Sequence, residues 1–239
     1  MEKPSRFLAN SSTALEQLRG LINQHESTPG TPLPTERELS ETLGVGRREV
    51  RRALDVLEEE GRIGRKQGKG TFIGPSAPVV PLALQGLVQQ TNLLEVMEAR
   101  LQLEPGLARL AALRATRENL ALMQRMLERI DKVSPDDRDL NELWDSAFHR
   151  AIAEAAGNRL MLGLFDAIDA VRREPGWQHL RELARTPERV DHYNDHHQKI
   201  MSAIIHRQPN EAAAAMREHL LSLQSALIQA IHLEDDFTL

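Results

Sequence analysis

The chain has 239 residues, a length typical of one large domain or two modest ones, and two are expected. Hydrophobic residues make up 41% and charged residues 27%, which excludes a disordered protein. The absence of cysteine excludes disulfides, thiolate metal sites and cysteine nucleophiles, so any metal must bind through nitrogen and oxygen. No apolar run reaches the roughly 18 residues of a membrane span and residues 1–10 do not resemble a signal peptide, which predicts a cytoplasmic protein without a membrane partner.

The net charge of −5 is distributed unevenly along the chain. Residues 1–74 contain 12 Lys and Arg against 11 Asp and Glu, whereas residues 75–239 contain 18 against 24. Basic residues concentrate at Arg47–Arg52 and at Gly61–Gly74, and the second stretch has no acidic residue. These two stretches predict a local basic surface in the first part of the chain.

Prolines mark the predicted domain boundary. Pro75, Pro78 and Pro81 fall within seven residues, and no helix is expected to run through them. We therefore predict a first domain at 1–74, a linker at 75–82 and a second domain at 83–239. Only 3% of the residues are aromatic while Leu, Ala, Glu and Arg are abundant, so a mainly α-helical protein is expected.

The first domain should begin with two helices. Apolar residues at helical spacing predict a helix over Ser11–Gln24, followed by a loop over residues 25–34 that is rich in proline. Thr35 and Glu38 have the spacing of a capping box, which predicts the start of a second, short helix that ends at Gly44.

A third helix and a hairpin complete the predicted first domain. After the turn at residues 44–46, the stretch Arg47–Glu60 has apolar residues on one face and arginines on the other. The short runs 62–66 and 71–73 flank a glycine-rich tip at 67–70, which is typical of a β-hairpin. Two short helices joined by a tight glycine turn and followed by a hairpin predict a winged helix-turn-helix.

This pattern indicates DNA binding. A helix fits the major groove, and arginine can donate two hydrogen bonds to the edge of guanine. Arg47, Arg48 and Arg51 lie in the first turns of the third helix, and Lys69 lies among glycines at the hairpin tip, where it can reach a phosphate or the minor groove. The alternative interpretation is a charged helix face that only contacts solvent.

Residues 11 to 74 resemble the N-terminal winged helix of the GntR family of bacterial transcription regulators. The resemblance rests on Pro34–Leu39, Leu43–Val45, Arg47, Val50–Arg51, Ala53–Leu54, Leu57, Gly61 and Gly68–Phe72. It implies that Arg37, Arg47 and Arg51 contact DNA and that Gly68 lies at the wing tip. Family members usually have Ser or Thr where this chain has Gly46, and Glu49 adds an acid near the interface, so we expect an atypical operator preference.

The second domain should be an antiparallel helical bundle. Apolar periodicity predicts six helices, over Thr91–Leu113, Thr116–Lys132, Pro135–Ala156, Leu160–Arg173, Pro187–His206 and Asn210–Leu233.

Four polar residues interrupt the apolar stripes of these helices. Asp145 and His149 are four residues apart and therefore lie side by side, while His197 and His219 lie on the stripes of two further helices. Together they can form a nitrogen and oxygen metal site. Alternatively, each histidine is a core residue whose nitrogens find hydrogen-bond partners.

Other histidines compete for the same role. His192, His196 and His206 are also candidates, but His192 and His196 face away from the apolar stripe of their helix and are expected to contact solvent.

Residues 90 to 230 resemble the FCD ligand-binding domain of the FadR-type subfamily of GntR regulators. The resemblance rests on Asp145–Ile152, Ala156–Asn158, His197–Ile200, Ala203–Ile204 and Met216–Leu220. It implies that Asp145, His149, His197 and His219 hold a metal ion, and the full set of four argues against an acyl-CoA effector. Relatives usually have an acid where this chain has His196, which leaves open whether His196 or His197 is the ligand.

Two residues are candidates for binding an effector. Arg100 lies on an apolar stripe, where it can bind the carboxylate of an effector or, alternatively, form a salt bridge with Glu104. Asn158 is a second candidate, and its alternative role is to cap the helix that starts near Arg159. Small organic acids that chelate metal are the expected effector class.

The sequence thus predicts a homodimeric, ligand-responsive repressor that reads a short palindromic operator and releases it when a carboxylate binds at the metal. Zn²⁺ is the expected ion, with Ni²⁺ or Mn²⁺ as alternatives. We expect no enzymatic activity. A metal-dependent, hydrolase-like enzyme fused to a DNA-binding module and a regulator with a purely structural metal are the alternatives.

Overall fold

The structure is a computed structural model that describes residues 10–24, 31–66, 70–73, 91–172, 177, 179, 181, 184 and 186–237. The chain divides into two compact units, and the main division falls between residues 79 and 80. The predicted linker at 75–82 lies outside the described residues, so the exact domain boundaries stay a prediction.

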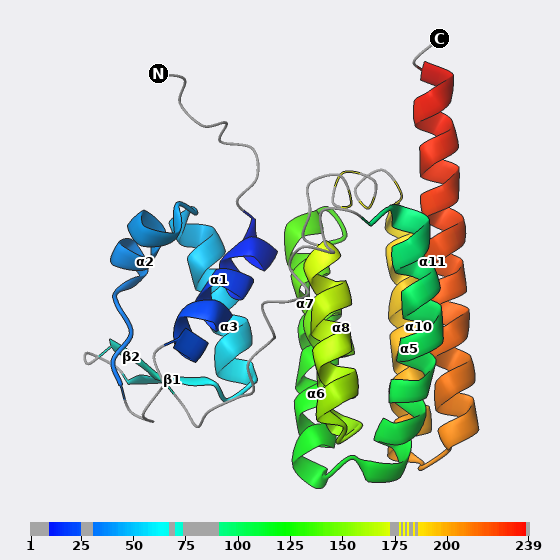
Figure 1. The fold of residues 1–239 in the computed structure, drawn as a ribbon, viewed down its shortest axis with the longest axis horizontal. Helices are drawn as coiled ribbons and strands as arrows, with labels where there is room; N and C mark the ends of the chain where they lie inside the picture. Colours follow the sequence, from blue (N-terminus) through cyan, green and yellow to red (C-terminus); the bar gives the residue numbers. More distant parts are fainter. Residues whose placement is uncertain are drawn as a thin grey trace. The chain divides into compact units, whose positions relative to one another are not determined.

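The first unit is a winged helix-turn-helix, as predicted (Figure 1). Helices α1 and α2 both pack against α3, and the buried residues Leu18, Leu39, Leu54 and Leu57 form the core between them. Its elements are α1 (Ser11–Gln24), α2 (Glu36–Leu43), α3 (Arg47–Glu59), β1 (Ile63–Lys66) and β2 (Gly70–Ile73).

The predicted capping box starts α2. The Thr35 hydroxyl accepts a hydrogen bond from the Glu38 amide at 3.3 Å, and the Glu38 carboxylate accepts one from the Thr35 amide at 2.8 Å. Gly44 ends the helix with a φ of 67°, a conformation that costs little only for glycine. These two signals fix the length of α2 and therefore the turn into α3.

The hairpin gains a third strand-like segment that the sequence did not predict. Strands β1 and β2 pair antiparallel, with Ile63 opposite Ile73. Residues 31–33, which we expected to lie in a loop, pair with the other edge of β2: the Leu33 amide donates to the Thr71 carbonyl and the Ile73 amide donates to the Thr31 carbonyl, both at 2.8 Å. The prediction of a loop missed this pairing because Pro32 and Pro34 are typical of loops, although an edge segment tolerates proline.

The second unit is a helical bundle, also as predicted (Figure 1). Helices α5, α10 and α11 pack side by side, α8 packs on α5, and α6 packs on α10. Its described helices are α5 (Leu93–Arg114), α6 (Arg117–Ile130), α7 (Arg138–Ala155), α8 (Arg159–Val171), α10 (Pro187–Ile205) and α11 (Pro209–Phe237). Among the described residues, no helix combines the length and apolarity that a membrane span requires.

Side-chain caps set where these helices begin. The side chain of each capping residue accepts a hydrogen bond from an amide of the first turn; these residues are Asn92, Thr116, Asp137, Asn158 and Thr186. Asp137 explains why α7 begins at Arg138 and not at the predicted Pro135. The caps of α7 and α10 thus fix the start of two of the helices that supply side chains to the interior of the bundle.

The capping box gives a first prediction. Replacing Thr35 with Ala removes the hydroxyl that satisfies the Glu38 amide, so the free energy of unfolding of the first unit should fall by about 1 kcal/mol. Thr35→Ser keeps the hydroxyl and serves as the control. Thermal unfolding followed by circular dichroism measures both variants, and equal midpoints for Thr35→Ala and the unchanged chain would contradict the role of this cap.

Candidate functional site

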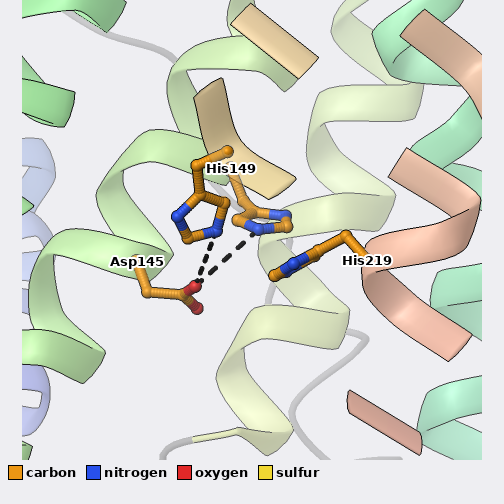
Figure 2. A group of neighbouring side chains, drawn as sticks. Asp145, His149 and His219 are labelled. Atoms are coloured by element: carbon orange, nitrogen blue, oxygen red, sulfur yellow. Dashed lines mark ion pairs between the residues drawn. The ribbon is translucent and has the colours of Figure 1, made fainter. Parts of the chain in front are cut away.

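Four side chains from three helices converge inside the bundle, and Figure 2 labels three of them, Asp145, His149 and His219. Asp145 and His149 project from one face of α7, His197 comes from α10 and His219 from α11. One ligand atom from each residue lies within 4.8 Å of the others, and each residue is at most 7% exposed. The structure therefore brings together the four residues that the sequence singled out, which we call the cage.

The cage contains imidazole nitrogens that lack hydrogen-bond partners among the described residues. They are Nε2 of His149 and both ring nitrogens of His197 and of His219. Asp145 Oδ1 lies 3.2 Å from His197 Nε2 and 3.9 Å from His149 Nε2. Because burying an unpaired polar atom costs about 1–3 kcal/mol, a bound cation would compensate several such losses at once.

The electrostatics of the cage favour the protonation states that ligate a metal. Burial lowers the pKa of His219 well below its ordinary value, and it also lowers the pKa of His197. Burial alone would raise the pKa of Asp145, but its contact with His197 and the charges of His149 and Arg172 hold that pKa well below its ordinary value. Neutral imidazoles at His197 and His219 beside an ionised Asp145 can bind a cation without releasing a proton.

A buried ion pair fixes the orientation of His149. Glu104 on α5 lies with Oε2 at 2.5 Å from His149 Nδ1, and its Oε1 accepts from Arg100 Nε at 2.5 Å. Burial alone would raise the pKa of Glu104, but the charges of Arg100 and His149 lower it to about 2. An ionised Glu104 can accept a hydrogen bond from Nδ1–H of His149, and in that tautomer Nε2 would present its lone pair to the cage.

Two arginines that we did not predict hold the cage aspartate. Arg172 Nη2 donates to Asp145 Oδ2 at 2.7 Å, and Arg181 Nη2 donates to the same oxygen at 3.4 Å. Oδ1 of Asp145 is thereby left to face the histidines. A signal for Arg172 exists in the sequence, because Leu162, Phe165 and Arg172 lie on one helical face.

The predicted effector residues occupy different settings. Arg100 is fully buried and forms the salt bridge with Glu104 that was its alternative role, but its Nη1 and Nη2 have no hydrogen-bond partner among the described residues. The Asn158 side chain caps α8, accepting from the amides of Leu160 at 3.1 Å and Met161 at 3.2 Å. A role for either residue in binding an effector stays a prediction.

The competing histidines divide between surface and interior. His192 and His206 are exposed, whereas His196 is only 1% exposed, so the prediction that His196 contacts solvent was wrong. Helix α10 packs against α5, α6 and α11, and these neighbours cover more than the one face that the apolar stripe marks. Among His196 and His197, the structure brings His197 into the cage.

The predicted DNA-contacting arginines lie on the surface of the first unit. Arg37, Arg47, Arg48 and Arg51 are exposed, and Arg51 Nη2 donates to Glu36 Oε2 at 2.9 Å. The predicted wing residues Gly68 and Lys69 lie outside the described residues.

The predicted basic surface at Gly61–Gly74 is smaller than its composition indicated. Arg62 is buried, and Arg65 is paired with Asp55 at 2.7 Å and Glu58 at 3.2 Å on α3. The count of charges within the stretch overlooked the acids of the neighbouring helix that pair with Arg65. The side chain of Lys66 and the whole of Lys69 lie outside the described residues, so their part of the basic surface stays a prediction.

Glu49 covers the start of α3. Gly46 is the N-cap residue and provides no side-chain hydrogen bond, and a Cβ added at Gly46 would overlap Oε2 of Glu49. The Glu49 carboxylate therefore occupies the place where a capping hydroxyl would lie. An acid at a helix N-terminus is stabilising, but the same position is where a phosphate would bind.

The sequence profile of "Bacterial regulatory proteins, gntR family" matches residues 10–73, and that of the FCD domain matches residues 95–222. The chain belongs to the GntR family. The positions of both matches agree with the two units of the structure, so this GntR regulator carries its FCD domain after the winged helix.

Individual relatives have similar architecture. The "Uxu operon transcriptional regulator" of Escherichia coli K12 is 32% identical over 91% of this chain and 86% of its own length. The "HTH-type transcriptional repressor NanR" of Salmonella newport is 33% identical over 88% of this chain and 82% of its own length. The solved structure of E. coli McbR/YncC is similar in fold, with a TM-score of 0.53, 20% identity and coverage of 92% of this chain and 97% of that one.

These similarities establish the biochemical class of the protein. It is a DNA-binding transcriptional regulator of the GntR family and not an enzyme, because the relatives that match it over most of its length are transcriptional regulators. The alternative of a metal-dependent hydrolase fused to a DNA-binding module is therefore set aside.

The position of Glu49 gives a second prediction. In Glu49→Gln the repulsion between this carboxylate and a phosphate disappears, so affinity for double-stranded DNA should rise by about 0.3–1 kcal/mol, which is about two- to fivefold. Fluorescence anisotropy with a labelled duplex at fixed salt measures the change. Glu41→Gln on the exposed face of α2 is the control, and unchanged or weaker binding by Glu49→Gln would contradict this interpretation.

Proposed function

We propose that this GntR regulator is a homodimeric repressor. It would dissociate from its operator when a small organic acid binds to a metal ion in the cage. The observation that carries the proposal is the buried set of unpartnered imidazole nitrogens beside an ionised carboxylate. Repression is supported by the similarity to a relative that is itself named a transcriptional repressor.

The donor set supports a divalent transition metal. Asp145, His149, His197 and His219 offer three nitrogens and one oxygen, which suit Zn²⁺, our preferred ion, and also Ni²⁺ or Mn²⁺. Glu104 is hydrogen-bonded to His149, and Arg172 is hydrogen-bonded to Asp145. Hydrogen-bonded neighbours of this kind orient the ligands in known metal sites. When bound, the ion would supply open coordination positions for a small anion.

Arg100 supports a carboxylate as the effector. Its two terminal nitrogens are buried and lack partners among the described residues, and they belong to the planar fork that binds a carboxylate through two parallel hydrogen bonds. An acid with a neighbouring hydroxyl, oxo or second carboxylate group could chelate the metal and pair with Arg100. We retain Asn158 as a second effector contact, although its side-chain oxygen is used in the cap of α8.

The DNA-binding part of the proposal concerns the first unit. Arg47, Arg48 and Arg51 would contact base edges and phosphates from the start of α3, Arg37 would contact the backbone from α2, and Gly68 and Lys69 would contact DNA from the wing. Two copies related by a twofold axis would read the two halves of a short palindrome. Arg51 would have to exchange its bond to Glu36 for a bond to DNA.

Effector binding and operator binding would then be linked. If the effector lowers affinity for the operator by some factor, the operator must lower affinity for the effector by the same factor. The linkage requires that the metal-bound acid stabilises a conformation of the dimer that fits the operator poorly.

The ion pair behind His149 gives a third prediction. Glu104→Gln removes the negative charge that supports His149, so the affinity for Zn²⁺ should fall by about 10–100-fold. Competition with a fluorescent zinc chelator measures this affinity. Glu98→Gln, an exposed acid on the same helix, is the control, and equal affinities for the two variants would show that Glu104 does not support the metal site.

The proposed switch gives a fourth prediction. A binding duplex is first selected from a random-sequence library with the purified protein. With Zn²⁺ present, at least one acid from a panel of hydroxy acids, sugar acids and dicarboxylates should weaken this complex by about 5–150-fold. Asp145→Asn should abolish the response, because the metal loses its only carboxylate ligand within the cage, whereas His206→Gln at an exposed position should retain it.

Calorimetry on the same panel separates the alternatives. An acid that binds the metal-loaded protein and leaves the affinity for DNA unchanged would refute the switch. If removal of the metal unfolds the second unit, and no acid binds before removal, the ion is structural and the proposal of an effector site fails.

A further inference from the structure

A second pair of histidines lies beside the cage on α10. His192 and His196 are four residues apart, and their ring centroids are 4.2 Å from each other. Two histidines at this spacing lie on the same helix face, the arrangement that supplies two metal ligands in helical zinc motifs. His192 is exposed, so an ion in solution can reach this pair.

His196 has unused ligand capacity. It is 1% exposed, and neither ring nitrogen has a hydrogen-bond partner among the described residues. Its Nε2 lies 3.5 Å from Oε1 of Glu218 on α11, a carboxylate that also faces Lys199 Nζ at 3.7 Å. The pair thus has a carboxylate nearby, although Lys199 competes for it, so an ion bound here would be held less tightly than in the cage.

The pair is continuous with the cage. The ring centroid of His196 lies 5.8 Å from that of His219, which is itself 4.7 Å from His197 and 5.0 Å from His149. A row of imidazoles therefore runs from the exposed His192 through the buried His196 to the buried cage. The cage ligands are at most 7% exposed, so an ion must pass through protein to reach them.

We propose that His192 and His196, assisted by Glu218, form an outer transition-metal site through which the ion is loaded into the cage. The loading role rests on the proposed function of the cage, whereas the outer site itself does not. With two protein nitrogens, one carboxylate oxygen that Lys199 also attracts, and water in the remaining positions, the outer site exchanges its ion quickly. The ion would then move from the outer site to His219, and so from a weak site to the cage, which offers more protein ligands.

The loading role is tested by the rate of metal uptake. The full-length chain is stripped of metal and mixed with Co²⁺ in a stopped-flow spectrometer, where the absorption bands of ligated Co²⁺ report entry into the cage. His192→Gln should slow uptake about tenfold, as expected for the loss of one ligand from the outer site, without changing the final absorption or the affinity of the cage. His206→Gln, an exposed histidine just after α10, should take up Co²⁺ like the unchanged chain. Equal rates for His192→Gln and the unchanged chain would overturn the loading role.

The outer site is tested in a chain with a disabled cage. The double variant His149→Gln and His219→Gln should still bind one equivalent of Ni²⁺ weakly in calorimetry, and addition of His192→Gln should abolish that binding. Absence of Ni²⁺ binding in the double variant, with its helical circular dichroism intact, would overturn the outer site. If the double variant does not fold, Asp145→Asn weakens the cage with a smaller change, and addition of His192→Gln to that variant should remove one weakly bound equivalent of Ni²⁺. If the unchanged chain binds only the outer ion, the proposed function of the cage fails while the outer site stands.

Discussion

Three imidazoles and one carboxylate lie together inside a helical bundle, buried from bulk solvent. Each unpaired nitrogen costs about 1–3 kcal/mol, a large part of the net stability of a typical domain. The rest of the second unit is arranged around this constraint: Asp145 and His149 share one face of α7, and α10 and α11 each contribute one further histidine. A cation at this point would accept one nitrogen lone pair from each imidazole and the charge of the carboxylate, and so would stabilise the arrangement.

Buried ion pairs surround the cage and give it a fixed geometry. Arg100 and Glu104 orient His149, while Arg172 and Arg181 hold the far oxygen of Asp145. Breaking a buried pair leaves an uncompensated charge, so these groups restrain one another strongly. Arg100 contributes to this restraint through Nε alone, which leaves its two other nitrogens for an anion. Under the proposed function, Arg100 would connect the metal site, the effector and helix α5.

Much of this arrangement could be predicted from helical periodicity. The cage was predictable because Asp145 and His149 continue the face of Ile152, and because a polar residue on an apolar stripe must point inward. The pairing of Arg172 with Asp145 could not be predicted in this way. The two residues are 27 positions apart, and they meet because α8 packs on the bundle. The sequence predicts an exposed His196 because the apolar stripe of α10 indicates a single buried face. In the structure, α10 packs against several helices, so more than one of its faces is buried. Residues 31–33 were assigned to a loop because the pairing with β2 is non-local.

X-ray absorption at the zinc edge of the purified, zinc-loaded chain tests the central claim most directly, because it reports the atoms bound to the ion. The account predicts a first shell of nitrogen and oxygen at about 2.0–2.1 Å and outer-shell scattering from three imidazoles, which disappears in part when His219 is replaced by glutamine. A first shell of oxygen alone, without imidazole scattering, would contradict it, since the ion would then lie outside the cage.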